Sequence, residues 1–279
     1  MLYNFIIYMC IPFTVISTAF IYFKISYDIY KYSSRTILNN YSTNYYYSYE
    51  YYKNSDWRIP LTFSIIYLLI VLNGKYLMQN SNPKNINTIM LWYNLYQCIV
   101  NGITVYVMVE NIINNPDFNL LGNMSNNINL SYWVWLHYAN KYIELLDTMF
   151  MILRKKFNQV SFLHCYHHVL LIWAWFLVIK VNPGGDSYFG AMINSFIHVI
   201  MYTYYSMPII GIKVPLFIKK MITNCQKLQF CVCLSHSIYV IYDGKLPIIL
   251  PLTQAFVMIN MLILFTQFSR KTYGKIKEN

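Results

Sequence analysis

Three histidines stand at the head of one apolar run, in the stretch FLHCYHHVLLIWAWF that begins at Phe162. On a helix, His164, His167 and His168 fall within about a hundred degrees of one another, so they share one side. An imidazole can ligate a transition metal, carry a proton or accept an acyl group covalently. The histidine box alone does not decide between a metal site and a catalytic centre.

A second group of reactive residues lies in the preceding apolar run, in KYIELLDT. Lys141, Glu144 and Thr148 are spaced by three and four, which places them on one helix face with Asp147 beside them. A charge at the middle of a bilayer costs roughly 2.5–3.5 kcal/mol, and such charges usually serve a function. A structural ion pair would explain Lys141 and Glu144 but leaves the second carboxylate unexplained, so we expect a functional cluster.

A third group forms a polar stripe in NSFIHVIMYTYY. Asn194, His198, Tyr202 and Tyr205 recur at spacings of four, four and three, again on one helix face. A lone histidine in a helix is more often a core residue, but this histidine has polar neighbours along its own face. We therefore interpret the stripe as part of a site.

A fourth stretch, TNCQKLQ, repeats polar side chains every three residues at Thr223, Gln226 and Gln229. Glutamines at the entrance of a helix can simply face the membrane interface. The same glutamines could also donate to a substrate. The spacing leaves both interpretations open.

Composition indicates what kind of protein must position these groups. The chain has 279 residues, 57% of them hydrophobic and 11% charged, and its mean hydropathy is +0.36. Soluble domains average about 25% charged residues. The net charge of +11 does not point to nucleic acid, because the basic residues cluster between apolar runs as in membrane loops. Six cysteines lack paired spacing, which argues against a disulfide framework or a zinc site.

The apolar runs approach the roughly 20 residues that a helix needs to cross a bilayer, and they predict an all-α, polytopic membrane protein. An earlier run, Leu2–Phe23, lacks the basic flank and the cleavage site of a signal peptide, so we keep it as an extra helix. The tyrosine-rich stretch 41–52 follows it and reflects composition bias. The seven main spans are expected at Ile59–Met78, Thr88–Glu110, Ser131–Leu153, Phe162–Lys180, Ser187–Met207, Ile222–Tyr242 and Pro247–Phe268.

Loop charge predicts the orientation of these spans. Basic residues fill the connections at 154–156 and 213–220 and the C-terminal tail, all on one side, which the charge rule makes cytosolic. The opposite connection, 111–130, has no lysine or arginine and contains acceptor triplets at Asn123 and Asn129, as expected of a lumenal loop. Lys275 and Lys277 near the end of the tail are typical of a retrieval signal for the endoplasmic reticulum.

Together, the four stretches resemble the ELO family of very-long-chain fatty acid elongases. The resemblance covers about Trp57 to the C-terminus, so we divide the chain into an N-terminal segment, 1–56, and an elongase membrane domain, 57–279. The family patterns are matched by Lys141, Glu144, Asp147 and Thr148; by His164, His167 and His168; by His198, Met201, Tyr202, Tyr204 and Tyr205; and by Thr223, Gln226 and Gln229.

The resemblance implies an enzyme of the endoplasmic reticulum membrane with seven transmembrane helices, six of them enclosing a tunnel for an acyl chain. It implies condensation of an acyl-CoA with malonyl-CoA, which releases carbon dioxide and CoA and gives a 3-ketoacyl-CoA. No metal and no cofactor are expected beyond these two substrates. A ketoacyl-CoA reductase, a dehydratase and an enoyl-CoA reductase would complete the cycle as partners.

For this chemistry we expect His167 to take the acyl group, with His164, His168 and His198 as catalytic partners. Cys165 is a weaker candidate for the nucleophile. Lys141, Glu144 and Asp147 would hold the histidines in place. Substrate contacts are expected from two sets: the polar donors Asn194, Tyr202, Tyr205, Gln226 and Gln229, and the basic residues Arg154, Lys155, Lys156, Lys219 and Lys220, which would bind CoA phosphates.

Two other classes of protein remain as alternatives. Di-iron membrane desaturases and hydroxylases also carry a box of this type, but they resemble one another in having many more histidine ligands than the six histidines of this chain. A non-catalytic transporter or receptor with seven helices would use the intramembrane charges to line a solute path. Such a protein would release no carbon dioxide from malonyl-CoA.

Overall fold

The computed structural model describes residues 55–114, 121–122 and 128–274. The expected helix Leu2–Phe23, the tyrosine-rich stretch, the Asn123 triplet, the side chain of Asn129 and the lysines at 275 and 277 lie outside the described residues. The division of the chain at residue 57 stays a prediction.

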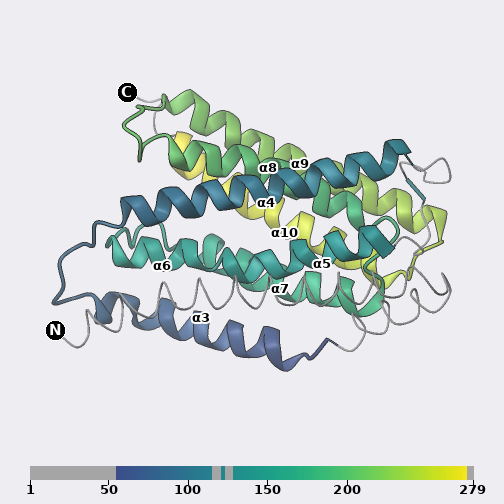
Figure 1. Cartoon of the computed structure of the whole chain (residues 1–279), viewed down its shortest axis with the longest axis horizontal. Helices are drawn as coiled ribbons and strands as arrows, with labels where there is room; N and C mark the ends of the chain where they lie inside the picture. The colour runs from purple at the N-terminus through teal and green to yellow at the C-terminus, as the bar shows by residue number, and fades with distance from the viewer. Residues whose placement is uncertain (1–54, 115–120, 123–127, 275–279) are drawn as a thin grey trace, which may run out of the picture. The chain divides into compact units, whose positions relative to one another are not determined.

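Regular secondary structure in the described part of the chain is helical, which confirms the all-α membrane fold. By length and composition, α3, α7 and α10 are apolar enough to cross a membrane. Counting α5 and α6 as one interrupted span, the helices match the seven expected spans (Figure 1). They are α3 (Arg58–Leu77), α4 (Asn87–Asn114), α5 (Ile128–Ile143), α6 (Leu146–Leu153), α7 (Phe162–Val181), α8 (Ser187–Ser206), α9 (Leu216–Asp243) and α10 (Ile249–Tyr273).

The span expected at Ser131–Leu153 is present, but it is interrupted at Glu144 and Leu145. There the backbone tightens: Leu145 N–H donates to the Tyr142 carbonyl at 3.3 Å, and Asp147 N–H donates to the Glu144 carbonyl at 3.1 Å. These are bonds to the third preceding residue, as in a 3₁₀ turn. The local sequence holds no proline or glycine, so contacts of this turn with other helices must override its helix propensity.

Helix contacts close a ring of six spans. Following these contacts, α4 packs on α8, α8 on α9, α9 on α10, α10 on α7, α7 on α5, and α5 returns to α4. Helix α3 packs on α6 and α7, on the outside of this ring. A further contact between α5 and α8 crosses the ring and divides its interior. One part lies between α7, α8, α9 and α10, and the other lies along α4.

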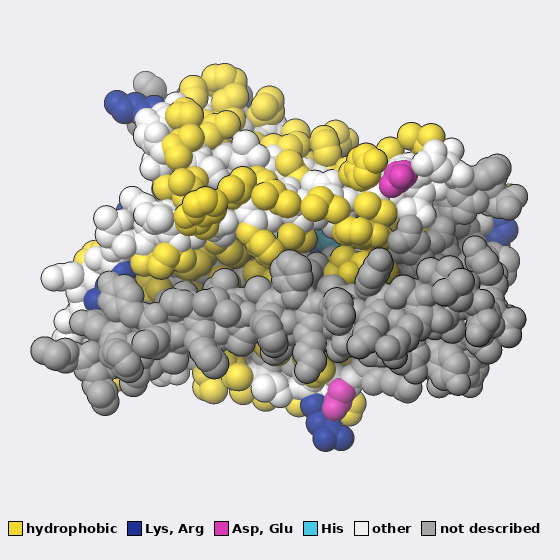
Figure 2. Space-filling model, viewed as in Figure 1, with side chains coloured by type: hydrophobic (Ala, Val, Ile, Leu, Met, Phe, Trp, Pro, Cys, Tyr) yellow, Lys and Arg dark blue, Asp and Glu magenta, His cyan; other side chains and the backbone are white. Residues whose placement is uncertain are grey.

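The outside of the ring is apolar, and the polar side chains of its helices turn inward. Figure 2 shows hydrophobic side chains over the face where α4 lies in Figure 1. Lipid tails solvate such a surface, whereas polar groups must find partners inside the protein. Along α4, the side chains of Trp92, Leu95, Ile99 and Ile103 are exposed, whereas those of Asn94, Gln97, Asn101 and Thr104 are buried.

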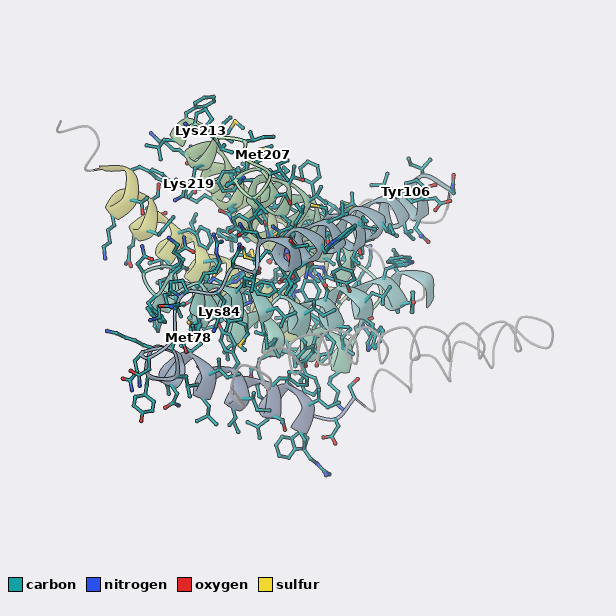
Figure 3. The ribbon with its side chains drawn as sticks, turned by 60° about the vertical axis from the view of Figure 1, so that its left-hand side comes forward. Met78, Lys84, Tyr106, Met207, Lys213 and Lys219 are labelled. Atoms are coloured by element: carbon teal, nitrogen blue, oxygen red, sulfur yellow. The ribbon has the colours of Figure 1, made fainter. Side chains whose placement is uncertain are left out.

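The basic loops gather at one end of the bundle, which we call the basic end. Figure 3 shows Lys84, Lys213 and Lys219 at this end, with Tyr106 at the opposite one. The loops touch one another here: Lys84 N–H donates to the Leu153 carbonyl at 2.9 Å, and Lys155 Nζ lies 3.4 Å from the Gln79 carbonyl oxygen. The arrangement agrees with the expected grouping of basic connections on one side.

Candidate active site

Glu144 is the centre of a buried polar cluster in the α5–α6 turn. Its Oε1 lies 2.8 Å from Lys141 Nζ, 3.2 Å from Asn140 Nδ2 and 3.2 Å from His198 Nδ1. Lys141 Nζ also donates to Asn194 Oδ1 at 2.9 Å. The side chains of Lys141 and Glu144 are 2% and 1% exposed, so the two charges balance each other away from water. This cluster joins two of the predicted motifs, because His198 and Asn194 come from α8.

Asp147, one turn further on, belongs to a second contact between α6 and α8. Its Oδ2 accepts a hydrogen bond of 2.7 Å from the Tyr202 hydroxyl. The Tyr93 hydroxyl of α4 lies 3.4 Å from that of Tyr202, and Gln97 Nε2 lies 3.4 Å from Tyr93. Neighbouring carboxylates are therefore held by different partners, a lysine for Glu144 and a tyrosine for Asp147.

Thr148 turns to a third set of partners, in α7 and α3. Its hydroxyl lies 2.8 Å from His164 Nε2 and 2.9 Å from the Tyr67 hydroxyl. Ser161 caps α7 by accepting a hydrogen bond from the His164 backbone N–H at 3.2 Å, which fixes where the histidine box begins. The three residues that were expected on one helix face therefore have different partners: Lys141 and Glu144 contact α8, whereas Thr148 contacts α7.

The three histidines of α7 lie together, as predicted from their spacing. The ring centroids of His164 and His168 are 4.5 Å apart, and those of His167 and His168 are 5.4 Å apart. They face different surroundings: His164 contacts Thr148, His168 is buried beside the Tyr67 ring, and His167 lines a cavity.

This cavity lies between α7, α8, α9 and α10 and has a volume of about 80 Å³. His167, Asn194 and Gln229 contribute polar groups toward the basic end. The wall beyond them is mostly apolar, with Leu171, Trp175, Phe230, Val257 and Met261 among its residues. A long apolar ligand with a reactive head group at His167 would match this distribution.

Polar side chains return toward the far end of the cavity. His236 Nε2 lies 3.6 Å from Asp186 Oδ2, and His236 Nδ1 lies 3.3 Å from Gln254 Nε2. Asp186 also accepts a 2.7 Å hydrogen bond from the Gly122 backbone, and Lys245 Nζ lies 3.3 Å from the Gly122 carbonyl oxygen. The hydrogen bond that the Lys245 ammonium donates to the Asp243 carboxylate raises the pKa of Lys245. These contacts link the α4–α5 connection to α8 and to the α9–α10 loop.

The predicted substrate contacts are not all in one place. Asn194 and Gln229 line the cavity, but Tyr202 is engaged with Asp147 and Tyr205 is 38% exposed. Gln226 contacts the Met201 sulfur at 3.7 Å. Arg154, Lys155, Lys156, Lys219 and Lys220 belong to the basic end, where Arg154 contacts the Met90 sulfur and Lys156, Lys219 and Lys220 are exposed.

Several polar partners were missed from the sequence. His137 and His236 were not among the candidate site residues, yet His137 Nδ1 lies 3.0 Å from the Ser195 hydroxyl and its ring packs edge-on against Trp175. Asn140 and Gln97 join the Glu144 cluster from two helices. Gln97 and Asn101 could have been found, because their spacing of four within an apolar run is the signal that identified Asn194 and His198.

No group of three or more histidine, cysteine, aspartate or glutamate side chains is arranged to hold a metal ion within the described ranges. The absence of a metal requirement stays a prediction. The cysteines of these ranges are free thiols, and Cys165 is half-buried beside the histidine box.

The fold and the site define a multi-pass helical membrane protein with a buried His, Lys and Glu centre beside a largely apolar cavity. Comparison with protein families shows the same class. The chain belongs to the ELO family, described as GNS1/SUR4, whose model matches residues 52–279. The resemblance inferred from the four motifs is confirmed, and with it the assignment to fatty acid elongation at the level of the family.

Curated relatives are similar over most of the chain. Very long chain fatty acid elongase 5 of Xenopus laevis is 37% identical over 221 residues, covering 76% of this chain and 74% of the relative. Fatty acid elongase 5 of Trypanosoma cruzi is 33% identical over 224 residues, covering 80% and 86%. Very long chain fatty acid elongase 4 of Mus musculus is 32% identical over 242 residues, covering 81% and 77%.

Proposed function

We propose that this protein catalyses the condensing step of fatty acid elongation, as a 3-oxoacyl-CoA synthase acting on long-chain acyl-CoA and malonyl-CoA. The observation that carries the proposal is the placement of His167 on the cavity wall, with Asn194 linking the cavity to the Glu144 cluster. An acyl chain lying along the apolar wall would bring its thioester to His167. Family membership and the names of the relatives support the same reaction class.

In the proposed first step, an imidazole nitrogen of His167 attacks the acyl thioester. The nitrogen–carbonyl bond forms, the carbon–sulfur bond breaks, and the imidazole proton passes to the departing CoA thiolate. Asn194 and Gln229 are the candidate donors to the thioester oxygen, because both line the cavity near His167. The acyl group then stays on His167 while CoA leaves.

In the second step, malonyl-CoA loses carbon dioxide and its bonding electrons form an enolate. The enolate carbon attacks the acyl carbonyl, the acyl–histidine bond breaks, and the released imidazole takes up one proton. His198, whose Nδ1 lies 3.2 Å from Glu144 Oε1, is the candidate proton carrier: its ring takes a proton from water and passes it to the released imidazole. Lys141 keeps that carboxylate charged and in position.

The basic end would receive the CoA parts of both substrates. Arg154, Lys155, Lys156, Lys219 and Lys220 are the candidate phosphate ligands, since phosphate groups bind well to Arg and Lys. The concentration of basic loops at this end favours a cytosolic orientation for it. With the lysines of the tail, this supports residence in the endoplasmic reticulum with a cytosolic C-terminus.

The proposed reaction needs no cofactor beyond its two substrates. Its 3-ketoacyl-CoA product must be reduced, dehydrated and reduced again before another cycle. We therefore propose a ketoacyl-CoA reductase, a dehydratase and an enoyl-CoA reductase as partners in the same membrane.

The test is to purify the protein in detergent with its phospholipids and supply acyl-CoA and radiolabelled malonyl-CoA. Wild-type protein should release labelled carbon dioxide and form 3-ketoacyl-CoA, whereas His167→Ala should form none. His236→Gln is the matched control, because His236 lines the same cavity at its other end. Product from His167→Ala at the wild-type rate would remove His167 from the mechanism, and no product from wild type with any primer would overturn the proposed function.

A second measurement tests the covalent step. Wild-type protein incubated with acyl-CoA alone should carry an acyl mass on the peptide that contains His167. An adduct on Cys165 instead would identify that thiol as the nucleophile. Condensation at the wild-type rate with no adduct on any residue would favour direct attack on the thioester.

A further inference from the structure

A relay of side-chain amides lies behind Glu144, on the side of the ring away from the cavity. Asn101 Nδ2 donates to the Gln97 side-chain oxygen at 3.2 Å and to the Gln97 backbone carbonyl at 2.8 Å. Asn140 Nδ2 donates to the same Gln97 side-chain oxygen at 2.8 Å and to Glu144 Oε1 at 3.2 Å. The relay therefore runs from Asn101 through Gln97 and Asn140 to the carboxylate.

All members of the relay are withdrawn from water and from lipid. Gln97 is 0% exposed, Asn101 and Asn140 are each 1% exposed, and the Glu144 side chain is 1% exposed. Buried amides are costly unless they are hydrogen-bonded, so a bundle that needed only close packing here would be better served by apolar residues. The position of these amides beside the cluster suggests that they act on it.

The relay fixes the direction of each amide. The Gln97 oxygen receives two N–H groups, which sets its orientation and in turn directs the Asn140 amide. Asn140 then supplies one of three nitrogen neighbours of Glu144 Oε1, the others being Lys141 and His198. Of these three nitrogens, only Lys141 Nζ also contacts Glu144 Oε2, at 3.1 Å. Without Asn140, the carboxylate would be free to rotate toward the lysine and away from His198.

We propose that Asn140 and Gln97 are positioning residues, which keep Glu144 Oε1 facing His198 during the condensation. This inference rests on the proposed function. Neither residue lines the cavity, so neither is expected to touch substrate. Their effect on the reaction passes through Glu144 to the imidazole.

The test compares Asn140→Leu and Gln97→Met, which keep approximate size and remove the hydrogen bonds. Each should lower kcat for 3-ketoacyl-CoA formation by between about 10- and 100-fold, as expected for small misplacements of a catalytic group, and leave KM for both substrates unchanged. The double variant should lose little more than Asn140→Leu alone, because both act through one relay. Each rate is divided by the amount of folded protein, which size-exclusion chromatography in detergent measures.

Thr104→Val is the matched control. Thr104 is buried on the same face of α4, but its hydroxyl donates to the Val100 carbonyl of its own helix, 2.9 Å away. It should retain wild-type kcat. Two results would overturn the inference: unchanged kcat per folded protein in Asn140→Leu, or additive losses in the double variant. Wild-type protein is measured in the same assay. If the proposed function is wrong, wild-type protein forms no product; if only the positioning role is wrong, wild-type protein is active and Asn140→Leu is equally active.

Discussion

Tyr202 of α8 donates a 2.7 Å hydrogen bond to the Asp147 carboxylate of α6 and thereby ties the two helices together at the edge of the Glu144 cluster. Tyr202 is completely buried, and its ring packs edge-on against Tyr93 of α4. Three spans therefore meet at one hydroxyl group. Glu144 and His198, in the same two segments of the chain, depend on the register that this bond helps to set.

Tyr202→Phe should remove the donor and leave the Asp147 carboxylate without it. Loss of one partner of a buried hydrogen bond costs about 1–3 kcal/mol, so we expect a lower free energy of unfolding and a reduced rate of condensation. Thermal unfolding in detergent and the malonyl-CoA assay measure the two effects. Tyr205→Phe is the control, since Tyr205 packs against the Tyr202 ring but is 38% exposed. Equal losses in both variants would contradict the importance of the Asp147 bond.

Gly190→Leu should reduce the maximum length of acyl chain that the cavity accepts. Gly190 lines the cavity, and a Cβ there would lie at ordinary contact distances, 3.6 Å from Gln254 Oε1 and 3.7 Å from Trp175. Alanine should therefore be tolerated, whereas a leucine side chain would occupy cavity volume. A ladder of acyl-CoA lengths should show reduced turnover of long primers and retained turnover of short ones. Equal loss at every length would argue that the acyl chain does not pass Gly190.

Gly122→Ala should destabilise the far end of the bundle. Gly122 has a φ of +84°, and a Cβ would lie 3.2 Å from Lys245 Nζ and 3.3 Å from Asp243 Oδ2. A left-handed backbone costs roughly 1–2 kcal/mol for a residue with a Cβ. The melting temperature in detergent should fall. Gly102→Ala is the matched control, because Gly102 is helical with nothing within 4 Å of the new Cβ, and it should melt no lower than wild type.

Chelators separate the condensing enzyme from a di-iron enzyme. Treating the purified protein with EDTA and phenanthroline should leave 3-ketoacyl-CoA formation unchanged, because the proposed steps use imidazole, amide and carboxylate groups only. Elemental analysis should find less than one iron per chain. Loss of activity that returns on adding iron would revive the alternative in which His164, His167 and His168 are metal ligands.

The elements with a local signal were well predicted from the sequence. Helix α7 was expected at Phe162–Lys180 and is found at Phe162–Val181, because Ser161 is an N-cap and the run behind it is apolar. The clustering of the three histidines followed from their spacing alone. The family resemblance added the ring of six spans, which no spacing rule contains.

The features that were missed depend on contacts between distant segments. The interruption at Glu144 occurs in a sequence with good helix formers, so it could not be anticipated from propensity. Asp186 and His236 are fifty residues apart, and nothing in either segment announces their pairing. The amides of α4 are different, because their spacing of four is visible in the sequence. They were missed because the search for polar groups within the apolar runs favoured charged residues and histidines.

The buried amide face of α4 also governs how the chain must be assembled. The ribosome completes α4 well before α8, the helix that packs most extensively against it. The Gln97 side-chain oxygen accepts a 2.8 Å hydrogen bond from Asn140 of α5, the next helix to be made, and lipid offers no such donor. Tyr93, on the same face, packs against Tyr202 of α8 and must wait for that later helix. The buried face of α4 is therefore expected to be completed in two steps during biosynthesis, first by α5 and then by α8.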